Sequence, residues 1–211
     1  DIPFIEYVAS KNKAMLISTG MASKDEIKHV VDAMKRQKND QFVLLKCSSA
    51  YPAKHSDMNL RMIQEFKKEF ECLVGLSDHS MDSLSAIVAI SQGAKVIEKH
   101  FCLDREVETP DVKFSMLPSD FSKMIQEIRQ VEEVLGSVQY GPSEGERENV
   151  KFRRSIFLSQ DIKKGQRITE DCIKSVRPSY GEDPALWNQV IGSVAKRDLK
   201  FGEPLKGEDY E

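Results

Sequence analysis

Two histidines stand just after apolar segments of the chain, and a carboxylate lies next to each. His79 follows Asp78 in the stretch GLSDHS, and His100 stands two residues after Glu98 in KVIEKHF. Neutral imidazoles with nearby carboxylates can bind a divalent cation, and a partly open site of that kind can polarise a carbonyl group. A histidine at such a position can also be a structural residue held by hydrogen bonds. The spacing alone leaves both interpretations open.

Hydroxyl side chains occupy similar places after neighbouring apolar segments. Ser18 belongs to the stretch STG, Ser77 to LSD and Tyr51 to AYP. Serine hydroxyls and adjacent backbone N–H groups can bind the oxygens of a phosphate or carboxylate group. Ser18 and Ser77 are therefore candidate anion ligands, although serines also cap helices and form turns. Tyr51 is either the wall of a substrate pocket or a ring packed on a turn.

Two charged residues in predicted loops are further candidates. Asp111 follows Pro110 in TPDVKFS, where a loop carboxylate can orient a substrate; a solvated carboxylate is the alternative. Arg177, in the last part of the chain, is either a ligand or a surface arginine. The four cysteines form no CxxC pair, which argues against a zinc cluster and for reduced thiols in a cytoplasmic protein.

The segments that carry these residues alternate between strand and helix patterns. Apolar runs at 13–19, 42–48, 73–77 and 95–101 are predicted strands, and each is followed by a segment with helical spacing of apolar residues. The helix predicted after the first strand has a capping box that starts at Ser23, and Gly136 is the predicted C-cap of the last of these helices. Such alternation predicts parallel strands whose carboxyl ends meet at one rim, either in half of a TIM barrel or in a small open sheet.

The last third of the chain does not continue the alternation of strand and helix patterns. A linker rich in Gly, Pro and Ser is predicted at 137–150, between a first domain at 1–136 and a second at 151–211. The second domain contains an internal repeat, because DIKKGQRITED at 161–171 resembles DLKFGEPLKGE at 198–208. Each copy predicts two short strands around a glycine turn. A small β-rich module with a pseudo-twofold axis is the expected fold.

The composition indicates a soluble globular protein. The 211 residues are 40% hydrophobic and 31% charged, with a net charge of −3, so neither nucleic acid nor an anionic membrane is an expected partner. No apolar run approaches the roughly 18 residues of a membrane span, and no signal peptide is visible. The chain opens without a methionine in what resembles the middle of a helix, which suggests a fragment.

Several motifs, in this order, resemble those of the sialic acid synthase family. They are ISTGM, LLKCSSAYP, GLSDHS, VIEKHF, TPDVKFSM and a terminal module containing VRP. The resemblance implies a TIM barrel followed by a small antifreeze-like domain, also called a SAF domain. It implies condensation of phosphoenolpyruvate with a six-carbon amino sugar to give a nonulosonic acid. CSSAYP and TPDVKFSM look most like pseudaminic acid synthases, with N-acetylneuraminic and legionaminic acid as alternative products.

The resemblance also implies a role for each candidate residue. His79 and His100 would be the metal ligands, with Mn²⁺ or Mg²⁺ as the ion, and Glu98 would move a proton at the reacting atoms. The remaining candidates would bind substrates: Ser18 and Ser77 the phosphoenolpyruvate, Ser49, Tyr51 and Asp111 the sugar, and Arg177 the sugar from the other subunit of a domain-exchanged homodimer.

Other observations keep different readings open. The family has a first half-barrel that supplies further phosphoenolpyruvate ligands, and this chain starts after it, so these residues alone are predicted to be poorly active. A non-catalytic carbohydrate-binding fragment is one alternative. Another is a TIM-barrel aldolase that forms a Schiff base, but strand alternation points Lys99 away from Glu98 and His100.

Overall fold

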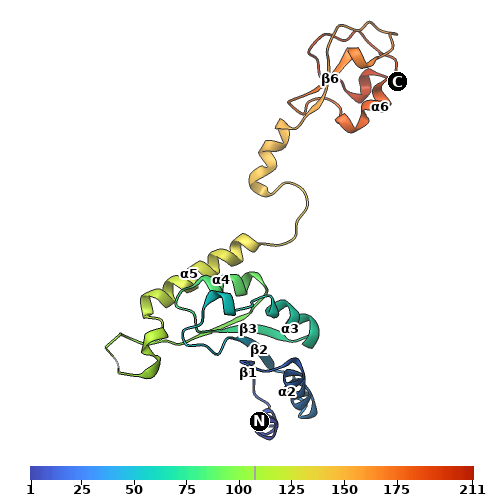
Figure 1. The fold of residues 1–211 in the computed structure, drawn as a ribbon. Coiled ribbons are helices and arrows are strands. Elements are labelled where there is room, and N and C mark those ends of the chain that lie inside the picture. The colour runs from blue at the N-terminus through green and yellow to red at the C-terminus, as the bar shows by residue number, and fades with distance from the viewer. Residues whose placement is uncertain (107) are drawn as a thin grey trace. The chain divides into compact units, whose positions relative to one another are not determined.

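The computed structural model describes residues 1–106 and 108–211, and it divides the chain into two compact units, Asp1–Ser137 and Val138–Glu211 (Figure 1). The predicted linker at 137–150 begins at this division, and its second half belongs to a 3-10 helix, Glu144–Phe152. Each unit has its own apolar core.

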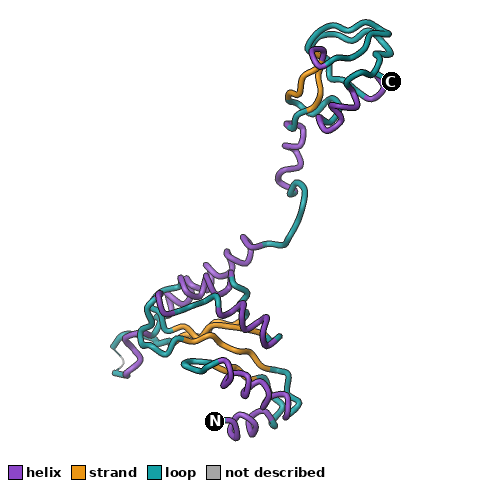
Figure 2. Tube along the Cα trace, turned by 45° about the vertical axis from the view of Figure 1, so that its right-hand side comes forward, coloured by secondary structure: helices purple, strands orange, loops and turns teal. Residues whose placement is uncertain are grey.

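The first unit is a parallel sheet with helices between successive strands. Its four strands pair in the order β1-β2-β3-β4, and Figure 2 shows them lying next to one another. This confirms the predicted α/β architecture of half a TIM barrel. The elements are α1 (Ile2–Ala9), β1 (Met15–Ser18), α2 (Lys24–Arg36), β2 (Phe42–Cys47), α3 (Met62–Phe70), β3 (Leu73–Asp78), α4 (Leu84–Ser91), β4 (Val96–Lys99) and α5 (Pro118–Leu135).

Local signals define the ends of the helices. The predicted capping box at the start of α2 is present, since the Ser23 hydroxyl accepts from the Glu26 backbone N–H and the Glu26 carboxylate accepts from that of Ser23. The predicted C-cap of α5 is also present, where Gly136 has φ of 50°. The helix at the beginning of the chain starts at Ile2, with Asp1 as its N-cap.

The helices cover one face of the sheet and form the core with it. Leu44, Val74 and Leu76 on that face are almost fully buried against Ile63 and Phe66 of α3. Alternation along the strands places the other face opposite the helices. On it Leu16 and Leu73 are 56% and 60% exposed. The same face would point inward in a closed barrel.

The strand register brings the polar ends of the strands to one rim. Ser18 pairs with Leu45, Cys47 with Ser77, and Ser77 with Glu98. Paired residues in neighbouring strands share a face of the sheet. These side chains therefore belong to the face that the helices leave uncovered.

The second unit is small and is built around one antiparallel pair of strands. Its two strands, β5 (Ser155–Leu158) and β6 (Ile173–Val176), pair antiparallel. A core of apolar residues such as Ile168 and Leu199 fills its interior. Loops and turns make up most of the remainder, with short 3-10 segments and a single helical turn, α6 (Trp187–Val190).

The internal repeat forms a reciprocal contact between its two copies. Asp161 in the first copy accepts from Lys200 Nζ at 2.8 Å, and Asp198 in the second copy accepts from Lys163 Nζ at 2.8 Å. Ile162 and Leu199 form a bridge between the copies. This exchange supports the predicted pseudo-twofold arrangement. The predicted strands of each copy are wrong, however, because isolated bridges replace them.

Candidate active site at the carboxyl rim of the sheet

A carboxylate and a hydroxyl meet where β3 and β4 end. The Ser77 hydroxyl donates to Glu98 Oε1 at 2.7 Å, because the register places the two residues side by side. Ser77 is buried, whereas Glu98 is exposed. The carboxylate is thus held on one oxygen and remains accessible to a substrate.

The two candidate histidines lie together beside this carboxylate. Their ring centroids are 5.2 Å apart. His79 Nδ1 is 2.8 Å from the backbone oxygen of Ser48, and His100 Nδ1 is 3.4 Å from Asp111 Oδ2. With Ser77, Glu98 and Lys99 the two imidazoles line a hollow of about 290 Å³.

Two aromatic rings close one side of the histidine pair. The Tyr51 ring lies 4.2 Å from that of His79 and 5.2 Å from that of Phe114, measured between centroids. Phe114 in turn is 4.9 Å from His100. Tyr51 remains 53% exposed. Tyr51 thus packs against His79 and Phe114, and its part in a substrate pocket stays a prediction.

The loop after β4 returns to the site. It contains a 3-10 helix, Pro110–Phe114, which carries Asp111 and Phe114. The Ser115 hydroxyl donates to the Asp111 backbone oxygen at 2.8 Å. The Asp111 carboxylate is 57% exposed and faces His100. This geometry brings the loop carboxylate to the rim, as the sequence predicts.

The predicted serine ligands lie at different places on the rim. Ser77 is at the centre, beside Glu98. Ser18 is exposed at the end of β1 and lines a separate hollow with Thr19. Ser49 lies next to Gly20. If Gly20 had a Cβ atom, that atom would be 3.1 Å from the Oγ of Ser49. The structure thus brings Ser49 and the loop after β1 together.

Arg177 belongs to the second unit. It directly follows β6, and its side chain is exposed. Its assignment as a sugar ligand from another subunit stays a prediction. Within the described residues the four cysteines form no disulfide.

The histidine pair fits part of a metal site. In the described part of the chain no group of three or more His, Cys, Asp or Glu side chains is close enough to hold an ion. Each imidazole, however, has its Nδ1 next to an oxygen, of Ser48 for His79 and of Asp111 for His100. Histidines that bind metals are typically held in this way, with the second nitrogen left for the ion.

Sequence reasoning missed two contributors to the site. Phe114 contacts His100, and its place inside the quoted motif TPDVKFSM was the available signal. Asp78 and Lys99 form an ion pair at 2.8 Å directly next to the histidines. Strand alternation correctly pointed Lys99 away from Glu98, but the identity of its partner depends on the register.

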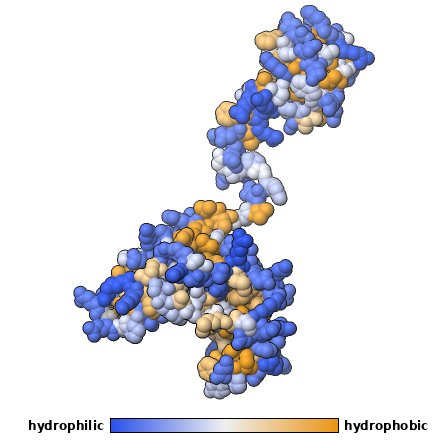
Figure 3. Space-filling model, viewed as in Figure 1, coloured by the Kyte–Doolittle hydropathy of each residue, from blue (hydrophilic) through white to orange (hydrophobic). Residues whose placement is uncertain are grey.

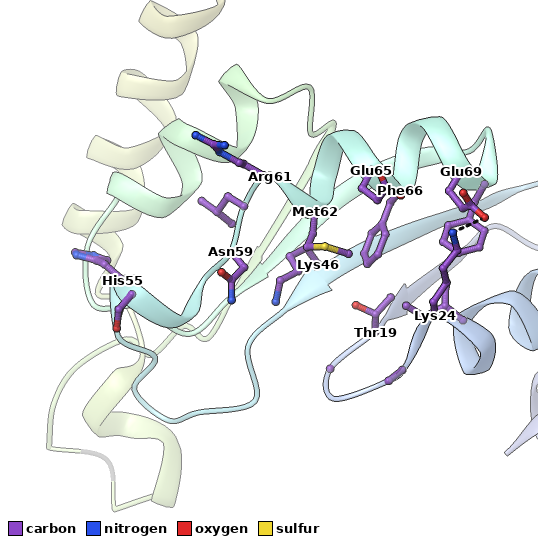
Figure 4. A pocket seen from close by; sticks show the side chains of 16 residues that line it. Thr19, Lys24, Lys46, His55, Asn59, Arg61, Met62, Glu65, Phe66 and Glu69 are labelled. Carbon is purple, nitrogen blue, oxygen red and sulfur yellow. Dashed lines mark ion pairs between the residues drawn. The ribbon is translucent and has the colours of Figure 1, made fainter.

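A larger pocket, of about 1050 Å³, lies between α2, α3 and the loop after β2. Figure 4 shows Lys46 on its wall and the ion pair between Lys24 and Glu69, which spans 2.9 Å. Burial lowers the pKa of Lys46 below its ordinary value. None of the predicted site residues lines this pocket, so its size does not make it the candidate site.

Known protein families match both units of this chain. The NeuB family matches residues 1–140, and the SAF domain matches residues 153–211. No helix within residues 1–106 and 108–211 is long and apolar enough to cross a membrane.

Individual relatives agree with these matches. The chain is 41% identical to the pseudaminic acid synthase of Campylobacter jejuni subsp. jejuni, over 100% of this chain and 62% of that protein. It is 37% identical to the N,N′-diacetyllegionaminic acid synthase of Legionella pneumophila subsp. pneumophila, over 100% of this chain and 61% of the relative. The chain therefore spans less than two thirds of the length of these curated relatives.

A solved structure shows the same similarity. The N-acetylneuraminic acid (sialic acid) synthetase from Leptospira borgpetersenii, in complex with citrate, aligns with a TM-score of 0.66 and 34% identity. The alignment covers 71% of this chain and 52% of that one.

Proposed function

The chain belongs to the NeuB family and carries a SAF domain, and we propose that the complete protein condenses phosphoenolpyruvate with an open-chain six-carbon amino sugar. The product is a nonulosonic acid, pseudaminic acid in the first instance, and phosphate is released. The observation that carries this proposal is the rim itself, where Glu98, Ser77 and two histidines meet. Relatives with synthase names support it.

The reaction forms one carbon–carbon bond and one carbon–oxygen bond at C2, and it breaks the carbon–oxygen bond that joins C2 to phosphate. The methylene carbon of phosphoenolpyruvate attacks the sugar aldehyde, whose oxygen takes up a proton. Water adds to C2, loses a proton, and the phosphate group leaves with the oxygen that joined it to C2. The protein must therefore hold an anionic substrate, orient an aldehyde and move protons.

Glu98 is the residue suited to move a proton. One of its oxygens is fixed by the Ser77 hydroxyl at 2.7 Å, and its carboxylate is exposed at the rim. General acid–base catalysis by a positioned carboxylate contributes typically about 10²- to 10⁴-fold in rate. Glu98 therefore orients the aldehyde or the water and transfers the proton.

The other rim residues bind the substrates. Ser18 holds the phosphate or the carboxylate of phosphoenolpyruvate through its hydroxyl, and Ser77 does so when its single O–H turns from Glu98 to the substrate. Tyr51, Ser49 and Asp111 contact the sugar, and the Tyr51 ring lies over His79 at 4.2 Å. His79 and His100 hold a divalent ion, Mn²⁺ or Mg²⁺, whose contribution when bound is to polarise the aldehyde.

Assembly and location follow from the same proposal. Arg177 reaches the sugar from the SAF domain of the partner subunit in a domain-exchanged homodimer. Phosphoenolpyruvate is a cytoplasmic metabolite, so we propose a cytoplasmic location.

The product is tested with a chain extended at its N-terminus to the length of its relatives. Phosphate release is measured with phosphoenolpyruvate, Mn²⁺ and each candidate sugar in turn. We expect fastest turnover with the six-carbon precursor of pseudaminic acid. Faster turnover with the precursor of legionaminic acid would favour that product, which the Legionella relative supports. No phosphate release with any sugar would contradict the synthase and favour a non-catalytic carbohydrate-binding protein.

A further inference from the structure

Lys99 and Asp78 form a buried ion pair directly next to the two candidate metal ligands. The distance from Nζ to Oδ2 is 2.8 Å, and the side chains are 1% and 0% exposed. The register pairs Asp78 with Lys99 across β3 and β4. The next residues along the chain are His79 and His100. One pair of charges therefore joins the two backbone segments that carry the imidazoles.

The ammonium group of Lys99 donates hydrogen bonds to the end of β3 and to the segment that follows it. Besides Asp78, it donates to the backbone oxygen of Ser80 at 2.8 Å and to that of Asp82 at 2.9 Å. An ammonium group has three N–H bonds, so these three acceptors complete its set. Asp78 Oδ1 also accepts from the Ser80 backbone N–H at 2.8 Å. The backbone segment that includes His79 thus curves around the ammonium group.

Stability alone is a poor reason for this pair. Two buried charges lose their hydration, so apolar side chains of similar size often stabilise a protein as well or better. The preceding pair on the same face of the sheet is apolar, Leu76 with Ile97. An apolar pair, however, cannot bind two backbone oxygens. The distinctive effect of Lys99 is to fix the path of the chain after β3.

We infer that Lys99 and Asp78 are positioning residues that hold the backbone of His79 in register with that of His100. The link to metal binding rests on the proposed function, whereas the effect on the backbone does not. His79 is fixed from the other side by Ser48, whose oxygen lies 2.8 Å from its Nδ1. The backbone oxygen of His79 also accepts from the Ala53 N–H at 2.9 Å. Loss of the ion pair removes the anchor from β4 and leaves these two contacts with the segment after β2.

The backbone effect is measured by hydrogen exchange on the 211-residue chain. We expect Lys99→Met to increase exchange in residues 79–84 at least about tenfold, while exchange in α2 stays unchanged. The double variant Asp78→Asn, Lys99→Met removes both charges and keeps an acceptor for the Ser80 N–H. It is expected to recover thermal stability but to keep fast exchange in residues 79–84.

A matched control removes an ion pair of similar length elsewhere in the unit. Lys24 and Glu69 are 2.9 Å apart on the surface, and Lys24→Met is expected to leave exchange in residues 79–84 unchanged. Wild-type exchange in the double variant at those residues would overturn the inference, because the pair would then serve stability only. An equal increase in Lys24→Met would overturn it as well.

The consequence for metal binding is measured separately, on the chain extended at its N-terminus. Outer contacts of metal-binding histidines typically change affinity about 10- to 100-fold. We expect the double variant to weaken Mn²⁺ binding by that factor, with Lys24→Met unchanged. An extended wild-type chain that binds no Mn²⁺ would contradict the proposed metal, while the exchange comparison would still decide the role of Lys99.

Discussion

At the scale of single residues, the ends of β3 and β4 carry one polar contact on each face of the sheet. Glu98 and Ser77 lie on the face of the sheet that the helices leave uncovered, and they are joined at 2.7 Å. Lys99 and Asp78 lie on the opposite face and are joined at 2.8 Å. Adjacent residues of one strand thus take part in two separate contacts. In our proposals, the exposed contact serves the chemistry and the buried contact holds the backbone.

Glu98→Gln tests the role of the exposed carboxylate in the extended chain. Glutamine keeps the shape and can still accept from the Ser77 hydroxyl, but it cannot take up and release a proton. We expect kcat to fall about 10²- to 10⁴-fold, with little change in KM for phosphoenolpyruvate. Steady-state phosphate release measures both. Glu133→Gln on α5 is the control, and equal kcat for the two variants would exclude a proton-transfer role for Glu98.

At the scale of elements, the start of α2 depends on a local contact, whereas the repeat of the second unit depends on contacts between residues distant in the sequence. The capping box of α2 involves residues three apart, Ser23 and Glu26. The repeat of the second unit joins residues far apart in the sequence, Asp161 with Lys200. The single tryptophan, Trp187, belongs to the second unit. Its fluorescence therefore reports on that unit separately.

Ser23→Ala is expected to destabilise the first unit by about 1 kcal/mol, because it removes an acceptor for the free N–H groups of α2. Urea unfolding followed by far-ultraviolet circular dichroism measures the change, and the Trp187 fluorescence transition should not move. Ser143→Ala removes a similar box from the 3-10 helix Glu144–Phe152, which buries no residue, and should have less effect. An equal loss in both variants would contradict the expectation.

The second unit is expected to lose stability in acid. Hydrogen bonds from Lys200 and from the Phe201 backbone hold the pKa of Asp161 below its ordinary value, and those from Lys163 and the Lys164 backbone do the same for Asp198. A carboxyl group whose pKa is lower in the folded state stabilises that state above its unfolded pKa, about 3.9. This stabilisation is lost as the pH falls through the folded pKa.

Trp187 fluorescence during acid titration tests this dependence. The wild-type chain should need less urea to unfold its second unit below about pH 4. Asp161→Asn with Asp198→Asn should be less stable at pH 7 and should change less between pH 7 and pH 3. A pH dependence as steep as that of the wild type would mean that other groups cause the acid sensitivity.

At the scale of the whole molecule, apolar surface indicates where further protein belongs. Leu16 and Leu73 are exposed on the uncovered face of the sheet. Figure 3 shows apolar surface over α1 and near the end of α5, where Phe4 and Val134 are 61% and 87% exposed. Exposed apolar surface of this kind typically marks a contact with another part of a protein. The chain also spans only 62% of its Campylobacter relative.

We expect these 211 residues alone to turn over substrates poorly, and an N-terminally extended chain to be active. The physical reason is that a TIM barrel builds its site on eight strands, whereas the sheet of the first unit has four. Phosphate release is compared at equal concentrations of the two chains, and light scattering reports whether the shorter one self-associates through its apolar face. Equal turnover by both chains would contradict this prediction.

The sequence by itself determined the strands of the first unit and the candidate residues. Apolar runs marked all four strands of the first unit, since buried parallel strands are continuously apolar, and Ser23 and Gly136 marked helix ends through local contacts. The motifs also pointed to His79, His100 and Glu98. Each of these inferences depends on residues close together in the chain, which is why sequence patterns suffice.

Only the tertiary structure decided which of these residues meet. The pairing of Ser77 with Glu98 and of Asp78 with Lys99 depends on strand register, and a shift by one residue would exchange the two faces. The contact of Phe114 with His100 depends on how a loop returns to the rim. Such contacts join distant parts of the chain through packing and backbone pairing, which no local pattern specifies.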